Sequence, residues 1–381
     1  MRRRLTVVAL GVAALAAIAF EAADYQRGAA LVIDAGRLDG WAGPIAQVNE
    51  RRYRVSPAPV TSRHGRLTSR LYVPEGSVHR AVLLVPGVHA AGIDEPRLVG
   101  FAGDLAQRGM SVLTVELPDL QQYSITPQTT DMIEDAALWL SAQREVAPDG
   151  RIGVAGISFG GGLTIVAAGR PSLAGKIAFA LSFGGHGDFA RTLRFLCTGR
   201  LDGGGFLAPH DYGVVIILLG VAPRLVPADQ VETLRHGIRT FLQASHVDMV
   251  DKARAAAIFR QARDLGARMP EPAATYMRYV NARDVRTLGP LLHPHVGAIA
   301  EDRALSAERS PAPDAPVYLL HGADDNVIPA VESERLAAYL RPHTDVKLLL
   351  TPLITHAEVD RPPNFGEIWK LVSFWTAMLD E

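Results

Sequence analysis

The sequence predicts an α/β fold in which a mostly parallel sheet is covered by helices on both faces. Short segments rich in Val, Ile and Leu alternate with segments of helical periodicity along most of the chain. Several of these apolar segments lack a polar–apolar alternation, which is typical of strands buried on both faces. The 381 residues are 48% hydrophobic and 21% charged, so the chain can bury a large core and is not mostly disordered.

The expected elements follow one another as strand and helix. Strands are expected at Arg66–Val73, Ala81–Val85, Ser111–Val115, Arg151–Ala155 and Lys176–Phe183, with helices between them at Leu98–Arg108, Thr130–Arg144 and Phe159–Ala168. The same alternation returns with strands at Val317–Leu320 and Val346–Leu350 and helices at Glu332–Leu340 and Glu367–Leu379. We therefore assign residues 61–184 and 311–381 to one α/β core.

Residues 185–310 interrupt this alternation and have a mostly helical pattern. Apolar residues recur at helical spacing in Val231–Ala244 and Val250–Leu265. A stretch this long between two strands is too large for a loop, so we predict a helical cap. Its most apolar part, Gly213–Ala222, is too short to span a bilayer. It belongs either to the core of the cap or to an apolar pocket or membrane-facing surface.

The N-terminal segment resembles a membrane-targeting signal. Arg2, Arg3 and Arg4 precede an apolar run from Leu5 to Phe20, and Ala17-Ile18-Ala19 offers a small-residue cleavage site. Residues 1–23 are expected to form a membrane anchor or a signal segment, with a buried core helix as the alternative. Because positive residues stay on the cytoplasmic side, the catalytic domain would lie outside the cytoplasm, anchored or secreted after cleavage. Residues 24–60 are interpreted as a connector.

Composition excludes several kinds of function. A net charge of −1 gives no electrostatic basis for binding nucleic acid. The single cysteine, Cys197, cannot form an intramolecular disulfide or a multi-cysteine zinc site. His293-Pro294-His295 has no third ligand at a convincing spacing, so no metal is expected. No nucleotide-binding glycine motif is present, and no cofactor is implied.

The strongest chemical signal is Gly156-Ile157-Ser158-Phe159-Gly160, which matches the pattern G-x-S-x-G. An expected strand leads directly into it and an expected helix leads directly out. So tight a turn forces its central residue into strained backbone angles and requires small neighbours. The serine hydroxyl would then project at the carboxyl edge of the sheet, beside a helix N-terminus that favours negative charge.

A serine needs a base to remove its proton, and the base needs an acid to orient it. Asp324 and Asp325 both follow the expected strand at Val317–Leu320 and are candidates for the acid. Two histidines come after this acidic turn. His343 precedes a strand, at the wrong edge of a parallel sheet, whereas His356 follows the next strand and lies at the edge of the serine. Topology therefore selects His356.

These motifs resemble those of the α/β-hydrolase fold superfamily, over about residues 60–185 and 312–381. The resemblance implies the chain order Ser158, Asp325, His356, because the family pattern His-Gly-x-x-Asp corresponds to His321 through Asp325. The body is similar to the dienelactone-hydrolase and prolyl-oligopeptidase-like groups, whose members cleave esters, lactones or peptides.

The chain departs from many relatives in the loop expected to supply the oxyanion hole. It has Pro86-Gly87-Val88-His89 where many have His-Gly, so any of residues 87–89 is a candidate donor. We predict the N–H groups of Val88 and Phe159. His89, Glu116 and His186 follow strand ends at the same edge and are candidates for the substrate pocket.

The sequence thus predicts a serine hydrolase that cleaves an ester, lactone or thioester through an acyl-enzyme. Its substrate would be a small molecule with an apolar part, admitted past the cap. The alternatives are a peptidase or acyltransferase on the same triad, and a membrane-tethered binding protein that lacks catalysis.

Overall fold

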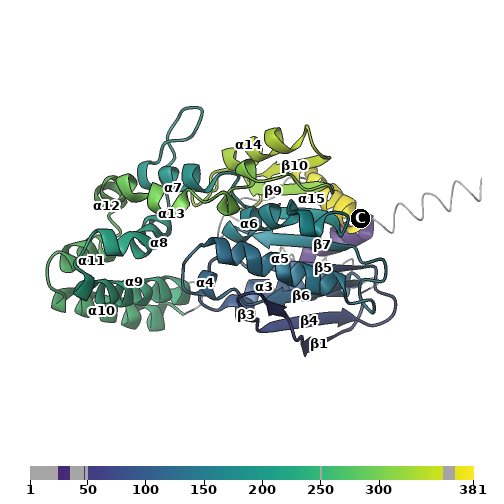
Figure 1. The fold of residues 1–381 in the computed structure, drawn as a ribbon, viewed down its shortest axis with the longest axis horizontal. Helices are drawn as coiled ribbons and strands as arrows, with labels where there is room; N and C mark the ends of the chain where they lie inside the picture. Colours follow the sequence, from purple (N-terminus) through teal and green to yellow (C-terminus); the bar gives the residue numbers. More distant parts are fainter. Residues whose placement is uncertain (1–24, 35–46, 48–49, 249–250, 355–364) are drawn as a thin grey trace, which may run out of the picture.

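The computed structural model describes residues 25–34, 47, 50–248, 251–354 and 365–381 (Figure 1). An eight-stranded sheet has the order β1-β4-β6-β5-β7-β8-β9-β10. The strands are β1 (Tyr53–Pro57), β4 (Ser69–Pro74), β5 (Arg80–Val85), β6 (Met110–Val115), β7 (Ile152–Ile157), β8 (Ile177–Phe183), β9 (Val317–Gly322) and β10 (Val346–Thr351). The pairs β1–β4 and β4–β6 are antiparallel and the others are parallel. The expected fold class is confirmed. A separate small hairpin joins β2 (Thr61–Ser62) and β3 (Gly65–Arg66).

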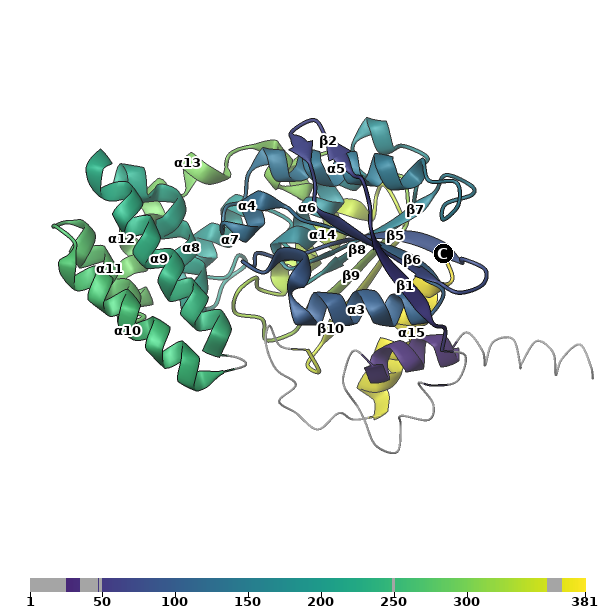
Figure 2. The same ribbon diagram turned by 90° about the horizontal axis from the view of Figure 1, so that it is seen from below.

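Helices cover both faces of the sheet (Figure 2). On one face lie α3 (Pro96–Gln107) and α15 (Phe365–Leu379); on the other lie α5 (Pro127–Ser141), α6 (Phe159–Ala168) and α14 (Val331–Leu340). The short helix α4 (Pro118–Gln121) leads into α5. Central strands contribute to both cores: in β5, Leu83 packs on the side of α5 and Leu84 on the side of α3. Burying such a side chain contributes about 1.5–3 kcal/mol, so both layers stabilise the sheet.

The range expected to be a connector, 24–60, contains two elements that join the core. Residues 25–34 are helical, and Leu31 is fully buried against the α15 side of the sheet. Tyr25 stacks on Trp369 of α15 with ring centroids 4.9 Å apart, and Arg27 pairs with Asp380 at 2.6 Å. Strand β1 then adds an edge to the sheet. These elements are short and their partners are distant in sequence, so local pattern did not show them.

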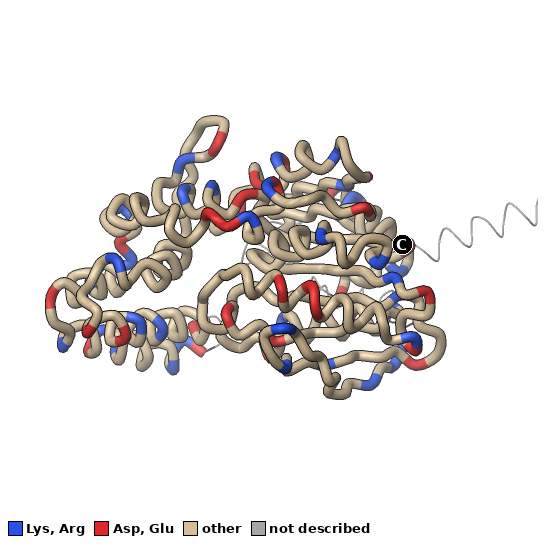
Figure 3. Tube along the Cα trace, in the orientation of Figure 1, with Lys and Arg blue, Asp and Glu red and all other residues tan. Residues whose placement is uncertain are grey.

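The cap is inserted between β8 and β9. Its helices are α7 (Phe189–Thr198), α8 (Asp211–Val221), α9 (Ala228–Asp248), α10 (Lys252–Arg268), α11 (Ala273–Asn281), α12 (Val285–Leu292) and α13 (Gly297–Ala300). The segment between β8 and β9 also contains short 3₁₀ turns at Ala222–Arg224, His293–His295, Arg303–Leu305 and Ala307–Arg309. Two further 3₁₀ turns, Gly92–Asp94 and Pro171–Leu173, belong to the core. These helices project from the carboxyl end of the sheet (Figure 1). Basic and acidic residues are interspersed along the chain of both core and cap (Figure 3).

The two ends of the cap lie side by side where they join the core. The N–H of Glu308 donates to the carbonyl of Gly187 at 3.0 Å, and the N–H of Phe189 donates to the hydroxyl of Ser306 at 3.0 Å. Arg191 then bridges Glu308, at 3.0 Å, and Glu332 of α14, at 2.6 Å. These two carboxylates raise the pKa of the Arg191 guanidinium above its ordinary value, against the effect of burial. The chain therefore enters and leaves the cap through one charged and hydrogen-bonded junction.

No helix in the described part of the chain is long and apolar enough to cross a membrane. The expected anchor or signal segment, residues 1–23, lies outside the described residues.

Candidate active site

Ser158 occupies a strained turn between β7 and α6. Its backbone angles are φ 56° and ψ −132°, a combination that non-glycine residues rarely adopt. The conformation is held from both sides, because the Ser158 N–H donates to the carbonyl of Phe183 at 2.7 Å and the Ser158 carbonyl accepts from the N–H of Gly161 at 2.8 Å. The surrounding chain therefore imposes the strained conformation that the G-x-S-x-G motif predicts.

Two glycines allow the loop after β5 to pack directly on this turn. A Cβ atom at Gly160 would clash with the carbonyl oxygen of Pro86, and one at Gly87 would lie 3.3 Å from the Cβ of Ser158. A side chain at Gly160 would push the loop and the serine apart. Because Gly87 and Gly160 have no side chains, the segment Pro86-Gly87-Val88 can pack directly against the turn at Ser158.

Two backbone N–H groups beside Ser158 are available to a ligand. Within the described residues, neither the Val88 N–H nor the Phe159 N–H has a hydrogen-bond acceptor. Phe159 is also the first residue of α6, where the helix dipole favours negative charge. Both Val88 and Phe159 are buried, at 8% and 2% exposure. Free donors in a site of low polarity can stabilise a developing oxyanion.

The two aspartates of the acidic turn after β9 differ in their exposure to solvent. Asp325 is 3% exposed and Asp324 is exposed. One carboxylate oxygen of Asp325 accepts the N–H groups of Val327 and Ile328, at 2.8 and 3.0 Å. A Cβ atom at Gly184, which directly follows β8, would lie 3.7 Å from the other oxygen. Asp325 therefore sits at the carboxyl edge of the sheet, after β9, which is separated by β8 from the strand β7 that precedes Ser158.

His321 lies beneath Asp325 and was not singled out by sequence reasoning as a functional side chain. It is fully buried, and its Nε2 lies 2.8 Å from the carbonyl oxygen of Ile328 and 3.5 Å from Asp325 Oδ2. Its Nδ1 lies 2.6 Å from the hydroxyl of Ser333. With both ring nitrogens engaged, His321 shapes the acidic turn from inside the protein.

The expected base, His356, lies outside the described residues, and its position stays a prediction. Strand β10 runs parallel to β9, with Thr351 opposite Gly322, so the chain leaves β10 at the edge where Asp325 lies. The alternative His343 is exposed and precedes β10, at the opposite edge. The described strands thus have the topology on which the choice of His356 depends.

The described residues form a mostly parallel sheet with helices on both faces and an antiparallel second strand. A strained serine follows β7, and a buried aspartate follows β9. The chain has an α/β-hydrolase fold. No protein-family model and no curated protein gives a significant match to the sequence.

Three solved structures show what this hydrolase fold is similar to. The hyperthermophilic esterase from the archaeon Pyrobaculum calidifontis is 16% identical with a TM-score of 0.46, over 93% of this chain and 90% of that one. The Pyrococcus horikoshii acylaminoacyl peptidase is 14% identical with a TM-score of 0.47, over 90% and 43%. A dienelactone hydrolase from Anabaena variabilis is 16% identical with a TM-score of 0.42, over 86% and 96%. Identities this low say nothing about a substrate.

The three candidates for the substrate pocket have different surroundings. His186 is fully buried beside the rings of Phe159 and Phe189, its Nε2 lies 2.8 Å from the carbonyl oxygen of Leu305, and burial lowers its pKa to about 4. Glu116 accepts a hydrogen bond from the amide of Gln121 at 2.9 Å. His89 is half-buried, its ring centroid lies 3.9 Å from that of His246 of the cap with the rings tilted by 36°, and burial lowers its pKa. None of the three lines the cavity described next.

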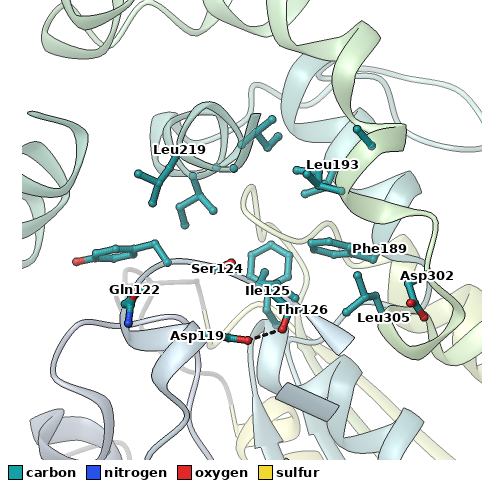
Figure 4. A pocket seen from close by; sticks show the side chains of 18 of the residues that line it. Asp119, Gln122, Ser124, Ile125, Thr126, Phe189, Leu193, Leu219, Asp302 and Leu305 are labelled. Carbon is teal, nitrogen blue, oxygen red and sulfur yellow. Dashed lines mark hydrogen bonds between the residues drawn. The ribbon is translucent and has the colours of Figure 1, made fainter. Parts of the chain in front are cut away.

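A cavity of about 590 Å³ lies between core and cap (Figure 4). It reaches Phe159, which directly follows Ser158, whereas Ser158 itself is not part of its wall. Its apolar wall is formed by the side chains of Tyr123, Ile125, Phe159, Phe189, Leu193, Leu196, Ile216, Ile217, Leu219, Ile299 and Leu305. Charged groups at Asp119, Arg235, Arg239, Glu301 and Asp302 complete it. The apolar stretch 213–222 thus forms part of α8 and lines this cavity as well as filling the cap core.

Proposed function

We propose that this protein is a serine hydrolase that cleaves an ester, lactone or thioester. The observation that carries the proposal is the strained backbone of Ser158. Holding a non-glycine residue at such angles costs on the order of 1–3 kcal/mol, and strain of this kind clusters at functional sites. The surrounding chain imposes this cost at the residue that the G-x-S-x-G motif marks as a nucleophile.

The chemistry follows from the placed groups together with the expected base. The Ser158 hydroxyl attacks the substrate carbonyl carbon while His356 takes its proton and Asp325 orients the imidazole. The carbonyl oxygen becomes an oxyanion, which accepts hydrogen bonds from the N–H groups of Val88 and Phe159. His356 then gives the proton to the leaving alcohol or thiol as its bond to carbon breaks. Water, activated by the same histidine, cleaves the acyl-enzyme and releases the acid.

The cavity beside Phe159 supports a substrate with an apolar part. Most of its wall is aliphatic or aromatic. Side chains of α7, the first helix of the cap, and of α8 contribute to it. A volume of about 590 Å³ falls within the range of small-molecule sites. We therefore place the apolar part of the substrate in this cavity, with the scissile carbonyl at the nucleophile turn.

The test is covalent labelling by a fluorophosphonate probe, together with turnover of p-nitrophenyl esters of graded chain length. The wild-type protein should be labelled and active. Ser158→Ala should abolish labelling and lower kcat by at least about 10⁴-fold, with the melting temperature nearly unchanged. Ser141→Ala is a matched control, because that serine donates to the Leu138 carbonyl within α5, away from the site.

A folded wild-type protein that is neither labelled nor active would contradict the proposal and favour a non-catalytic binding protein. Turnover of peptides in place of esters would support the same triad with an amine leaving group, and transfer to an added alcohol would support it with another acyl acceptor.

A further inference from the structure

A tyrosine of the cap holds the loop that carries a candidate oxyanion donor. The hydroxyl of Tyr212, in α8, donates to the carbonyl oxygen of Val88 at 2.8 Å. Val88 follows Gly87, and its own N–H has no acceptor among the described residues. The contact therefore reaches from the cap to the backbone beside the nucleophile.

The loop needs such a contact because of its sequence. Gly87 has no side chain, which lets the loop approach Ser158, but glycine also leaves the backbone free to rotate. Residues 86–88 lie beyond the end of β5, so they have no strand partner to fix them. A hydrogen bond to the Val88 carbonyl fixes the following peptide plane and restrains the rotation of Val88 itself.

Neighbouring rings fix the cap at the same point. The ring of His246 of α9 packs on that of His89 with centroids 3.9 Å apart and a tilt of 36°, and His246 Nδ1 lies 3.1 Å from the hydroxyl of Tyr123. Tyr212 and Tyr123 meet edge to face at 6.3 Å. His89 and Tyr123 belong to the core, whereas Tyr212 and His246 belong to the cap.

The histidine pair is neutral at ordinary pH. Burial lowers the pKa of His246 to about 3 and also lowers the pKa of His89. The two rings can therefore lie close together without repulsion between like charges, and His246 Nδ1 can accept a hydrogen bond from the Tyr123 hydroxyl. The cap is thus held in one position over the Val88 loop.

We infer that Tyr212 is a positioning residue for the oxyanion hole, so that the cap takes part in assembling the catalytic site as well as in enclosing it. This inference rests on the proposed function. Tyr212 does not touch the reacting atoms. It fixes the peptide that follows Val88 and so restrains the rotation of Val88, whose own N–H, in the preceding peptide, meets the oxyanion in the transition state.

The experiment compares Tyr212→Phe with Tyr339→Phe in the full-length protein. Tyr339, in α14 of the core, donates to the carbonyl of Ser310 at 2.7 Å, so its replacement removes the same kind of hydrogen bond elsewhere. Tyr212→Phe should lower kcat about tenfold while KM stays nearly constant, since the lost bond acts on the transition state. Tyr339→Phe should leave kcat and KM unchanged. The melting temperatures of the two variants should be lowered by similar amounts.

A second measurement separates positioning from a structural role. A trifluoromethyl ketone that carries the best acyl chain forms an oxyanion on the nucleophile, so its inhibition constant should rise by the same factor by which kcat/KM falls. The inference is overturned if Tyr212→Phe retains wild-type kcat and inhibition, or if KM and melting temperature change together while inhibition does not. Failure of the proposed function is distinct, because it would leave the wild-type protein itself unlabelled and inactive.

Discussion

The carboxyl edge of the sheet and the cap contribute to the candidate site in different ways. At the edge, Ser158 and Asp325 directly follow strands or their turns, and short backbone hydrogen bonds fix both. In the cap, the groups that contact the core come from the terminal turns of helices, Tyr212 from the first turn of α8 and His246 from the last turn of α9. The comparison indicates that topology positions the candidate catalytic residues Ser158 and Asp325, whereas the packing of cap helices shapes the cavity beside them and holds the loop at Val88.

The largest expected effect concerns the edge. Asp325→Asn should lower kcat by about 10³–10⁴-fold, because an amide no longer orients the base in its productive tautomer or stabilises its charged form. Asp324→Asn is the matched control and should leave kcat unchanged, since that carboxylate is exposed whereas Asp325 is buried. Steady-state kinetics with one ester measures both. If both substitutions lowered kcat equally, Asp325 would not be the residue that orients the catalytic histidine, and the prediction would be wrong.

A smaller, selective effect is expected in the cap. Leu219→Trp adds bulk to the wall of the 590 Å³ cavity, so kcat/KM for long-chain p-nitrophenyl esters should fall about 10- to 100-fold. The value for the acetate should change little. Leu291→Trp is the control, because Leu291 is 42% exposed on α12 and lies outside the cavity. A uniform loss for all chain lengths would show that the cavity does not hold the acyl part.

The smallest effect concerns stability, at the junction of edge and cap. The unfolded chain protonates His186 below pH 6.5, whereas burial keeps it neutral in the folded protein until about pH 4. Between these values the unfolded state binds more protons, so stability falls as the pH drops. His186 should account for about 2 kcal/mol of the loss between pH 7 and pH 5.

Urea unfolding at the two pH values tests this assignment. His186→Gln retains a donor for the Leu305 carbonyl but does not titrate, so its stability should change less between pH 7 and pH 5 than that of the wild type. Replacement of the exposed His343 by Gln is the control and should keep the wild-type dependence. An unchanged pH dependence in His186→Gln would mean that His186 is accessible to protons in the folded state.

The sequence predicted the sheet well where strands are buried on both faces. The expected strand Ala81–Val85 differs from β5 by one residue, and the expected helix Phe159–Ala168 coincides with α6. The helix expected at Thr130–Arg144 begins three residues earlier, at Pro127, and ends at Ser141. Proline suits the first turn of a helix because it needs no N–H acceptor there, and that signal was overlooked.

The site was predictable only where function depends on local turns. The strained Ser158 and the buried Asp325 each have a sequence signature, and the structure places both at one edge. Tyr212, His246 and Arg191 have none, because their partners Val88, His89 and Glu332 are distant in sequence and are brought near only by packing. His356 and the N-terminal segment lie outside the described residues, so the base and the membrane anchor or signal stay predictions.

The adjoining ends of the cap have a consequence for how such proteins diversify. Because the Glu308 N–H bonds to the Gly187 carbonyl, the whole cap is a loop whose ends are already closed. The entropic cost of a longer loop grows only with the logarithm of its length, so helices can be gained, lost or exchanged between these anchor points at little expense to the sheet. A cap grafted from another protein at residues 187 and 308 should therefore change which molecules enter the cavity while the α/β core beneath it still folds.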